Sequence, residues 1–129
     1  MPDLHLYEYA VIRVVPRVDR EEFLNVGVVL YCAAQGFLQS LSTVPHDRLR
    51  AFGTTVDPDE LAERLLAFEQ ICGGRQQGGP IGQLPLAARF RWLTATRSTV
   101  VQTSAVHPGL CVSASETVQR LYNQLVEPC

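Results

Sequence analysis

The stretch LYEYAVIRVVPR, Leu6–Arg17, decides the fold class of this chain. It is rich in β-branched and aromatic residues, which favour a β-strand, and its apolar residues fall on both faces of that strand. A strand with two apolar faces is typical of the middle of a sheet that is covered on both sides. Pro16 ends the strand, because proline has no N–H group to donate to a sheet. We therefore expect a central strand here.

Two more strands are expected directly after it. FLNVGVVLY, Phe23–Tyr31, is a second apolar run, interrupted by Asn25 and Gly27. A glycine inside a strand often marks a β-bulge or the close approach of another backbone. GFLQSLSTV, Gly36–Val44, alternates more weakly and predicts a third strand, and the CAAQG between the two runs is short enough for a hairpin.

The hydrophobic period then changes to that of helices. Asp57 followed by Pro58 is typical of a helix start, and Gly73 with Gly74 ends that helix. The preceding PHDRLRAF predicts one or two further helical turns. Pro85 begins another short helix.

The last third of the chain predicts a fourth strand and a final helix. TRSTVVQTSAV, Thr96–Val106, is the strand, and Ser113 with Glu116 forms a capping box at the start of the helix. The order is therefore βββ-α-α-β-α. It predicts an α+β fold in which a mostly antiparallel sheet of about four strands carries two or three packed helices. We find no linker and no repeat, so residues 1–129 are expected to form a single domain.

Length and charge limit the classes of function. A chain of 129 residues buries enough surface to fold without a disulfide or a metal ion. The net charge of −2 gives no general basic surface, so nucleic acid is not an expected partner. No apolar run approaches the length of a membrane span, and the N-terminus lacks the pattern of a signal peptide. We therefore expect a cytoplasmic protein that does not bind a membrane.

The cysteines and histidines predict neither a metal site nor a cofactor. No two cysteines have the CxxC spacing, and free thiols are the expectation in a reducing cytosol. The three histidines are scattered and form no ligand set. These residues are Cys32, Cys72, Cys111, Cys129, His5, His46 and His107.

Polar side chains on both faces set the fourth strand apart. On an extended strand Arg97, Thr99 and His107 share one face, and Ser98 and Gln102 share the other. A guanidinium binds carboxylate or phosphate through two parallel hydrogen bonds, hydroxyl groups donate beside it, and an imidazole gains or loses a proton near neutral pH. HPG, which begins at His107, predicts a rigid turn that holds the imidazole.

We therefore hypothesise a site for a small anion or for an acidic stretch of a partner protein. The structural alternative is an edge strand whose hydroxyl groups contact water and whose threonines are present for β-propensity. The candidate residues are Arg97, Ser98, Thr99, Gln102 and His107, joined by Arg13 and Asn25 from the first two strands.

The glycine-rich segment GGRQQGGPIGQLP, Gly73–Pro85, lacks the GK[ST] of a phosphate-binding loop. A connector is the favoured interpretation. The functional alternative is a lid over a neighbouring site, formed by the part of the segment that contains Gly78, Gly79 and Gly82.

Three other interpretations stay open. In a small enzyme acting on a phosphorylated or nucleotide-like substrate, His107 would be the acid or base and Arg97 the anion clamp. A nucleophilic Cys111 activated by His107 is a less favoured enzyme. In a structural homo-oligomer, the polar strand would pair with its own copy in a dimer. The enzyme question is left undecided, with a binding domain preferred.

Three blocks of the sequence resemble the bacterial family catalogued as domain of unknown function 3037. They are YEYAVIRVVPRVDREEFLNVGVVLYC, GPIGQLPLAARFRWL and RSTVVQTSAVHPGLC, and they are distributed over nearly the whole chain. The resemblance implies no catalytic residues. It does imply a partner, because members of this family are often encoded beside HipA-like kinases. The expectation is a small accessory domain of such a kinase.

Overall fold

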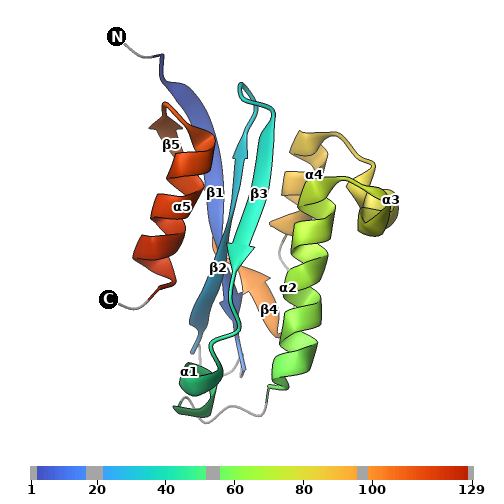
Figure 1. The fold of residues 1–129 in the computed structure, drawn as a ribbon, viewed down its shortest axis with the longest axis vertical. Helices are drawn as coiled ribbons and strands as arrows, with labels where there is room; N and C mark the ends of the chain where they lie inside the picture. Colours follow the sequence, from blue (N-terminus) through green and yellow to red (C-terminus); the bar gives the residue numbers. More distant parts are fainter. Residues whose placement is uncertain (1–2, 17–21, 52–55, 96–98, 128–129) are drawn as a thin grey trace.

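The computed structural model describes residues 3–16, 22–51, 56–95 and 99–127. Its strands are β1 (His5–Val14), β2 (Leu24–Cys32), β3 (Phe37–Ser42), β4 (Val101–Thr103) and β5 (His107–Cys111). Its helices are α1 (His46–Ala51), α2 (Pro58–Gly73), the 3₁₀ helix η2 (Gln76–Gly78), α3 (Gly79–Gly82), α4 (Leu86–Leu93) and α5 (Ala114–Leu125). The predicted α+β class and element order are confirmed (Figure 1).

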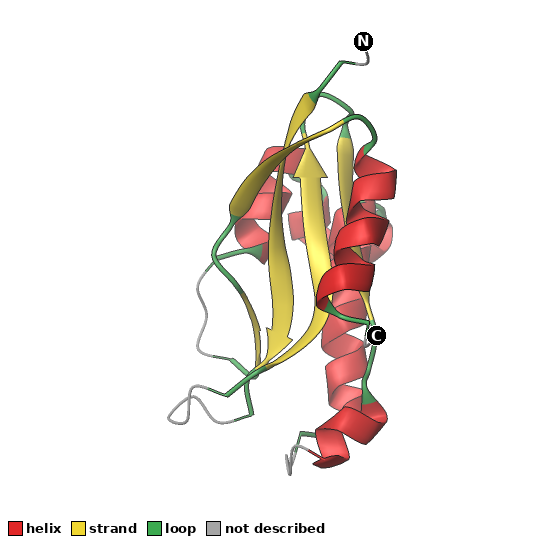
Figure 2. Ribbon diagram, turned by 90° about the vertical axis from the view of Figure 1, so that its left-hand side faces the viewer, coloured by secondary structure: helices red, strands yellow, loops and turns green. Residues whose placement is uncertain are grey.

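The strands form one antiparallel sheet with β1 in its middle. The order is β3-β2-β1-β4, and β5 pairs with the other half of the same edge of β1. Figure 2 shows the sheet between two helical layers, with α5 on one face and α2 with α4 on the other. The central position predicted for the first strand is therefore confirmed.

The two faces of β1 belong to two separate hydrophobic cores. Ala10, Ile12 and Val14 point to the side of α2 and α4, where they join a core that contains Phe68 and Phe90. On the opposite face the ring of Tyr7 packs into a second core; its other buried members include Val28, Leu30, Val118 and Leu121. Strand β1 therefore needs apolar residues at both odd and even positions, as its sequence shows.

A β-bulge lies at the predicted irregularity in β2. Ile12 is opposite Gly27 while Arg13 is opposite Asn25, so one residue of β2 has no counterpart in β1. A Cβ atom at Gly27 would lie 2.7 Å from the carbonyl oxygen of Leu41 and 2.8 Å from the Cβ of Ser42. Glycine is required here because another strand approaches closely. The bulge also reverses which residues of β2 face α5.

The ends of α2 follow the predicted signals. The side chain of Asp57 accepts a hydrogen bond from the backbone N–H of Asp59 at 2.9 Å, and Gly74 adopts the left-handed conformation at the C-terminus with φ 66°. Beside Gly74, the guanidinium of Arg89 donates to the carbonyl groups of Ile71 and Cys72 at 3.0 and 2.9 Å. A side chain of α4 thus completes the end of α2.

The structure divides the predicted fourth strand into two. β4 is short, and the HPG segment is the beginning of β5 rather than a turn. Ser104 lies between the two strands. Its backbone N–H donates to the carbonyl of Val11 at 2.8 Å, while its hydroxyl accepts from the N–H of Val11 at 2.9 Å. A side chain therefore replaces a main-chain acceptor, and the sheet continues across the break.

The HPG segment is extended because of its neighbours in the sheet. β5 is an edge strand, where a proline can be accommodated with its nitrogen facing away from β1. Gly109 is opposite Tyr7, and a Cβ atom there would lie 2.7 Å from Cε2 of that ring. The glycine makes room for a buried aromatic ring instead of forming a turn.

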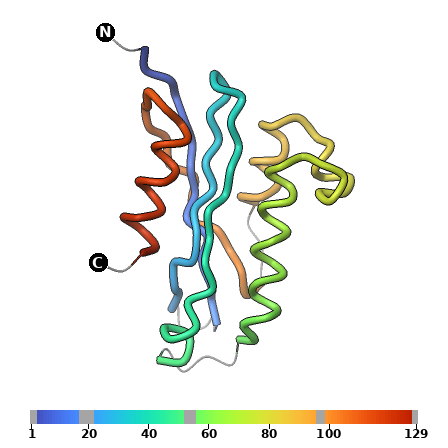
Figure 3. Tube along the Cα trace, viewed as in Figure 1, coloured from blue at the N-terminus to red at the C-terminus, as the bar shows by residue number. Residues whose placement is uncertain are grey.

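The chain trace in Figure 3 shows α5 and α2 running along opposite faces of the sheet. Of the helices within the described ranges, none combines the length and the apolar character needed to span a membrane.

Candidate functional site

Three of the predicted site residues lie side by side on neighbouring strands. Arg13 in the centre of the sheet is opposite Asn25 on one side and opposite Gln102 on the other. Residues directly opposite each other in an antiparallel sheet point to the same face. Arg13, Asn25 and Gln102 therefore form one row, which we call the Arg13 row, on the face that carries α5.

Arg13 lies at the centre of this row under an aromatic ring. Its guanidinium carbon is 4.1 Å from the centroid of the Phe23 ring, and Phe23 is itself 45% exposed. The Nε atom of Arg13 is buried and has no hydrogen-bond partner within the described part of the chain. A guanidinium that packs against an aromatic ring can still bind a carboxylate or phosphate through its other N–H groups.

Asn25 presents a second unsatisfied polar atom beside it. Its amide nitrogen donates to the carbonyl of Leu125, at the end of α5, at 3.1 Å. Its amide oxygen is buried and accepts no hydrogen bond from any described residue. Leaving a buried polar atom unpaired costs about 1–3 kcal/mol. Two such atoms on adjacent strands therefore need an explanation.

The side chains of Gln102 and Thr99 both donate to nearby backbone carbonyl groups. The side-chain amide of Gln102 donates to the carbonyl of Thr99 at 2.9 Å, and the hydroxyl of Thr99 donates to the carbonyl of Val101. These bonds stabilise the start of β4, so the structural alternative explains Thr99 well. Arg97 and Ser98 lie outside the described residues.

His107 shares the face of the Arg13 row but lies at the other end of the sheet edge. It is exposed, is opposite Tyr9, and its ring centroid is 5.4 Å from that of Tyr9. Tyr9 and Arg13 are four residues apart on one strand, which separates them by about 13 Å. The structure therefore does not bring His107 together with Arg13. Arg97, the other arginine expected near His107, lies outside the described residues.

The predicted pattern of faces was also wrong for this region. Gln102 and His107 were expected on opposite faces, but Gln102 is opposite Arg13 and His107 is opposite Tyr9, and both of these β1 residues face α5. The irregular backbone at Ser104 changes the alternation between β4 and β5. Gln102 and His107 consequently share a face although an odd number of residues separates them.

The pairing of His107 with Cys111 is contradicted by the same geometry. Both residues belong to β5, and four residues of extended strand separate their Cα atoms by about 13 Å. Burial raises the pKa of the Cys111 thiol, which keeps that thiol protonated and unreactive at neutral pH. A nucleophile and its base need hydrogen-bond contact, which this arrangement does not provide.

The glycine segment lies on the α2 and α4 side of the sheet, away from the Arg13 row. It forms η2 and α3, which pack against the end of α2 and against α4. Gly82 is buried, and a Cβ atom at Gly78 would lie 2.8 Å from the carbonyl oxygen of Gln70. Figure 1 places α3 beside α2 and α4, across the sheet from α5. Gly78 and Gly82 therefore allow close packing against neighbouring backbone, whereas Gly79 is needed for its left-handed conformation, with φ 63°.

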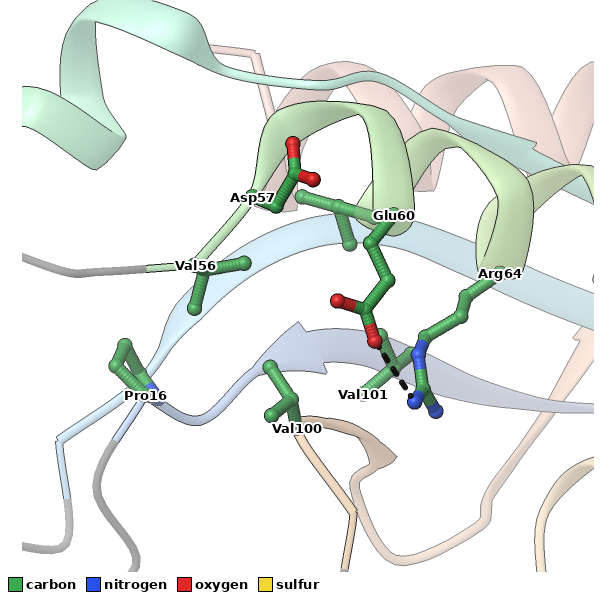
Figure 4. A pocket seen from close by; sticks show the side chains of 8 residues that line it. Pro16, Val56, Asp57, Glu60, Arg64, Val100 and Val101 are labelled. Atoms are coloured by element: carbon green, nitrogen blue, oxygen red, sulfur yellow. Dashed lines mark hydrogen bonds and ion pairs between the residues drawn. The ribbon is translucent and has the colours of Figure 1, made fainter.

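The structure shows a groove that the sequence did not suggest. A cavity of about 210 Å³ lies between the start of α2 and residues 100–101, and a second of about 210 Å³ continues it towards Trp92. Both cavities are lined by Arg64 and Val101. In Figure 4 the carboxylate of Glu60 and the guanidinium of Arg64 meet in the first cavity, at 3.2 Å. Oppositely charged residues four positions apart are common on the surfaces of helices, so the sequence offered no reason to choose Glu60 and Arg64 as site residues.

The clearest pKa shifts in the described part of the chain belong to buried cysteine and tyrosine side chains. Burial raises the pKa of Cys72 to about 11, and burial likewise raises the pKa of Tyr122. Groups perturbed in this direction stay neutral at physiological pH. Among the described residues there is no cluster of three or more His, Cys, Asp or Glu side chains that could hold a metal ion.

The fold and the Arg13 row define a class: a small antiparallel-sheet domain with helices on both faces and a row of polar side chains on one of them. The family model described as Protein of unknown function (DUF3037) matches residues 9–126. The chain therefore belongs to the DUF3037 family, as the resemblance of its three sequence blocks indicated. Comparison with curated proteins and with solved structures finds no match.

Proposed function

We propose that this protein is a non-enzymatic binding domain whose ligand contacts the Arg13 row. The observation that carries the proposal is the pair of buried, unpartnered atoms on neighbouring strands, Nε of Arg13 and Oδ1 of Asn25. An N–H donor and a carbonyl acceptor side by side match a ligand that both accepts and donates hydrogen bonds. Both atoms are buried in the unbound domain, so a ligand reaches them only when the groups that cover them move aside, and contact with both atoms would then remove the cost of leaving them unpaired.

The charge of Arg13 selects the chemistry of that ligand. A guanidinium binds carboxylate through paired hydrogen bonds, and the exposed ring of Phe23 beside it offers an apolar contact. Arginine and aromatic residues together are typical of the centres of protein interfaces. We therefore propose an acidic segment of a partner protein as the ligand, with a small anion as the alternative.

A binding role is better supported than the enzyme alternative. His107 has one aromatic neighbour in Tyr9, and within the described residues no hydrogen bond orients its ring. An exposed imidazole without an orienting group is a poor general acid or base. The row itself lies on a sheet surface, and binding a partner does not require an enclosed pocket.

The partner that we propose is a HipA-like kinase, because of the family to which the chain belongs. We place the complex in the cytoplasm of a bacterium, where the free thiols of Cys32, Cys72 and Cys111 would stay reduced.

Co-expression with a HipA-like kinase of the same organism tests the proposal. We expect a complex of defined stoichiometry in size-exclusion chromatography with light scattering. Calorimetry should then show that Arg13→Gln binds the kinase about tenfold more weakly or worse, because a charge-assisted hydrogen bond contributes about 1.5–3 kcal/mol. Arg75→Gln is the matched control, because Arg75 is exposed at the start of η2.

Each outcome has a distinct meaning, provided that both variants melt at the temperature of the wild type. Equal binding by Arg13→Gln and wild type would reject the Arg13 row as the site. Absence of any complex would reject the kinase, and titration with inorganic phosphate would then test the small-anion alternative. A mass that rises with concentration for the domain alone would favour the homo-oligomer.

A further inference from the structure

The two edges of the sheet differ in how they are protected. One edge is formed by β4 and β5, is broken at Ser104 and contains Pro108, and both features hinder the addition of another strand. The other edge is β3, whose sequence FLQSLS has neither a proline nor a charge. No described strand pairs with the outer side of β3. In Figure 1 this edge lies between α5 and α2.

The hydrogen bonds of β3 identify the groups that face outward. The backbone N–H of Thr43, which follows β3, donates inward to the carbonyl of Val26 at 2.9 Å. In an antiparallel pair, inward and outward residues alternate. The N–H and C=O groups of Leu38, Ser40 and Ser42 therefore point away from the sheet.

A cavity follows this outer edge. It has a volume of about 360 Å³ and lies between β3 and the C-terminal end of α2; its lining includes Leu38, Gln39, Ser40, Leu41, Glu69 and Cys72. Ser40 is only 5% exposed, yet its hydroxyl has no hydrogen-bond partner by distance and angle within the described chain. The thiol of Cys72, a weak acceptor, interacts with both the hydroxyl and the backbone N–H of Ser40.

We propose that the outer edge of β3 binds an extended segment of a partner protein as an added strand. Main-chain hydrogen bonds to Leu38, Ser40 and Ser42 would hold the segment, and a basic side chain of the segment would face Glu69. A carbonyl oxygen of the added strand is a stronger acceptor than the Cys72 thiol and would satisfy the donors of Ser40.

Charge argues for a partner segment instead of a second copy of this chain. Pairing of β3 with its own copy would bring two α2 helices together on the same side of the joined sheet. The exposed acidic residues of α2 include Asp59, Glu60, Glu63 and Glu69, against Arg64 as a basic one. Like charges would then oppose each other, whereas a basic segment meets a complementary surface. This edge is separate from the Arg13 row.

Amide hydrogen exchange with a synthetic peptide tests the inference. The probe is a nine-residue peptide of alternating threonine and valine with lysine at its centre. We expect saturating peptide to slow the exchange of the Leu38, Ser40 and Ser42 amides at least tenfold. We also expect the lysine peptide to bind up to about fivefold more tightly than the same peptide with a central glutamate, as a rim ion pair allows.

Two controls distinguish strand addition from simple electrostatic attraction between the peptide and the protein. N-methylation of the peptide at the alternate residues whose N–H groups face β3 should abolish binding, and N-methylation of the intervening residues should preserve it. Glu69→Lys should reverse the preference between the lysine and glutamate peptides, whereas Asp59→Lys, about 15 Å away on the same helix, should not.

Three results would overturn the proposal. One is unchanged exchange of the three amides at about 1 mM peptide. Another is equal binding by the two N-methylated peptides, which would show that no strand is added. The third is protection of these amides that grows with protein concentration in the absence of peptide, because a second copy would then occupy the edge.

Discussion

Ser104 and Gly109 show how single residues of an edge strand are chosen by the strand beside them. The hydroxyl of Ser104 accepts the N–H of Val11, so this buried serine is part of the sheet's own hydrogen bonding. Gly109 lies under the ring of Tyr7 and leaves space for it. Neither role is visible in the local sequence, because both depend on residues about 100 positions away.

Replacement of Gly109 by alanine tests this interpretation. A Cβ atom would overlap the buried ring of Tyr7, so we expect Gly109→Ala to lower the free energy of unfolding by about 1–3 kcal/mol in urea denaturation. Gly73→Ala is the control, because a Cβ atom there meets nothing within 4 Å. Its stability should be unchanged or slightly higher. Equal stability of Gly109→Ala and wild type would show that Tyr7 moves freely.

The buried thiol of Cys72 predicts how stability depends on pH. Its pKa rises from 9.0 to about 11 on folding because burial disfavours the thiolate. The folded state therefore holds its proton above pH 9 while the unfolded state releases it, and stability falls as pH rises from about 9 to 11. Below pH 9 the Cys72 thiol is protonated in both states, so it does not change the free energy of unfolding as pH varies.

Comparison of wild type with Cys72→Ala isolates this contribution. We expect the free energy of unfolding of wild type to fall by about 2 kcal/mol more than that of the variant between pH 8 and pH 11. Parallel curves for the two proteins over this range would mean that the thiol is equally accessible in both states.

At the scale of elements, α2 and α4 are joined through one side chain. Arg89 donates to carbonyl groups at the end of α2 and to that of Leu84 at 2.8 Å. A Cβ atom at Gly74 would lie 3.0 Å from the Cζ of Arg89, so the glycine also lets the guanidinium approach. The glycine segment between these helices is fixed by this contact and does not behave as a free connector.

Loss of that contact should cost more than loss of an ordinary surface arginine. We expect Arg89→Met to lower the free energy of unfolding by about 1.5–3 kcal/mol, the range for hydrogen bonds made by a charged group. Arg91→Met on the same helix is exposed and should stay within about 0.5 kcal/mol of wild type. Thermal and urea unfolding followed by circular dichroism compare the two. An equal effect of both variants would contradict the assigned role of Arg89.

At the scale of the whole molecule, an apolar patch remains exposed where β1 and β5 pair. Leu6 and Leu110 are opposite each other and are 60% and 62% exposed. Leu4 and Val112 continue the two strands and are 60% and 51% exposed. Contiguous exposed apolar patches often mark interaction surfaces.

Replacing leucines of this patch with charged residues should leave the fold intact. We expect the double variant Leu6→Lys, Leu110→Glu to unfold within about 0.5 kcal/mol of wild type, because both side chains are mostly in water. Binding of the dye ANS, which reports exposed apolar surface, should decrease. A loss of stability above about 1.5 kcal/mol would mean that the leucines pack against part of the molecule.

Local sequence patterns specify most elements of this protein, although not the division of the fourth strand into β4 and β5. Periodicity is a local property, so the two-faced strand at Leu6–Arg17, the bulge at Gly27 and the caps at Asp57, Gly74 and Ser113 could all be predicted. The tertiary structure alone decided what those elements bring together. It placed Arg13 beside Asn25 and Gln102, and it separated Arg13 from His107, because strand order and register depend on distant pairings. The break at Ser104 changed the faces of one strand, which no local alternation could indicate.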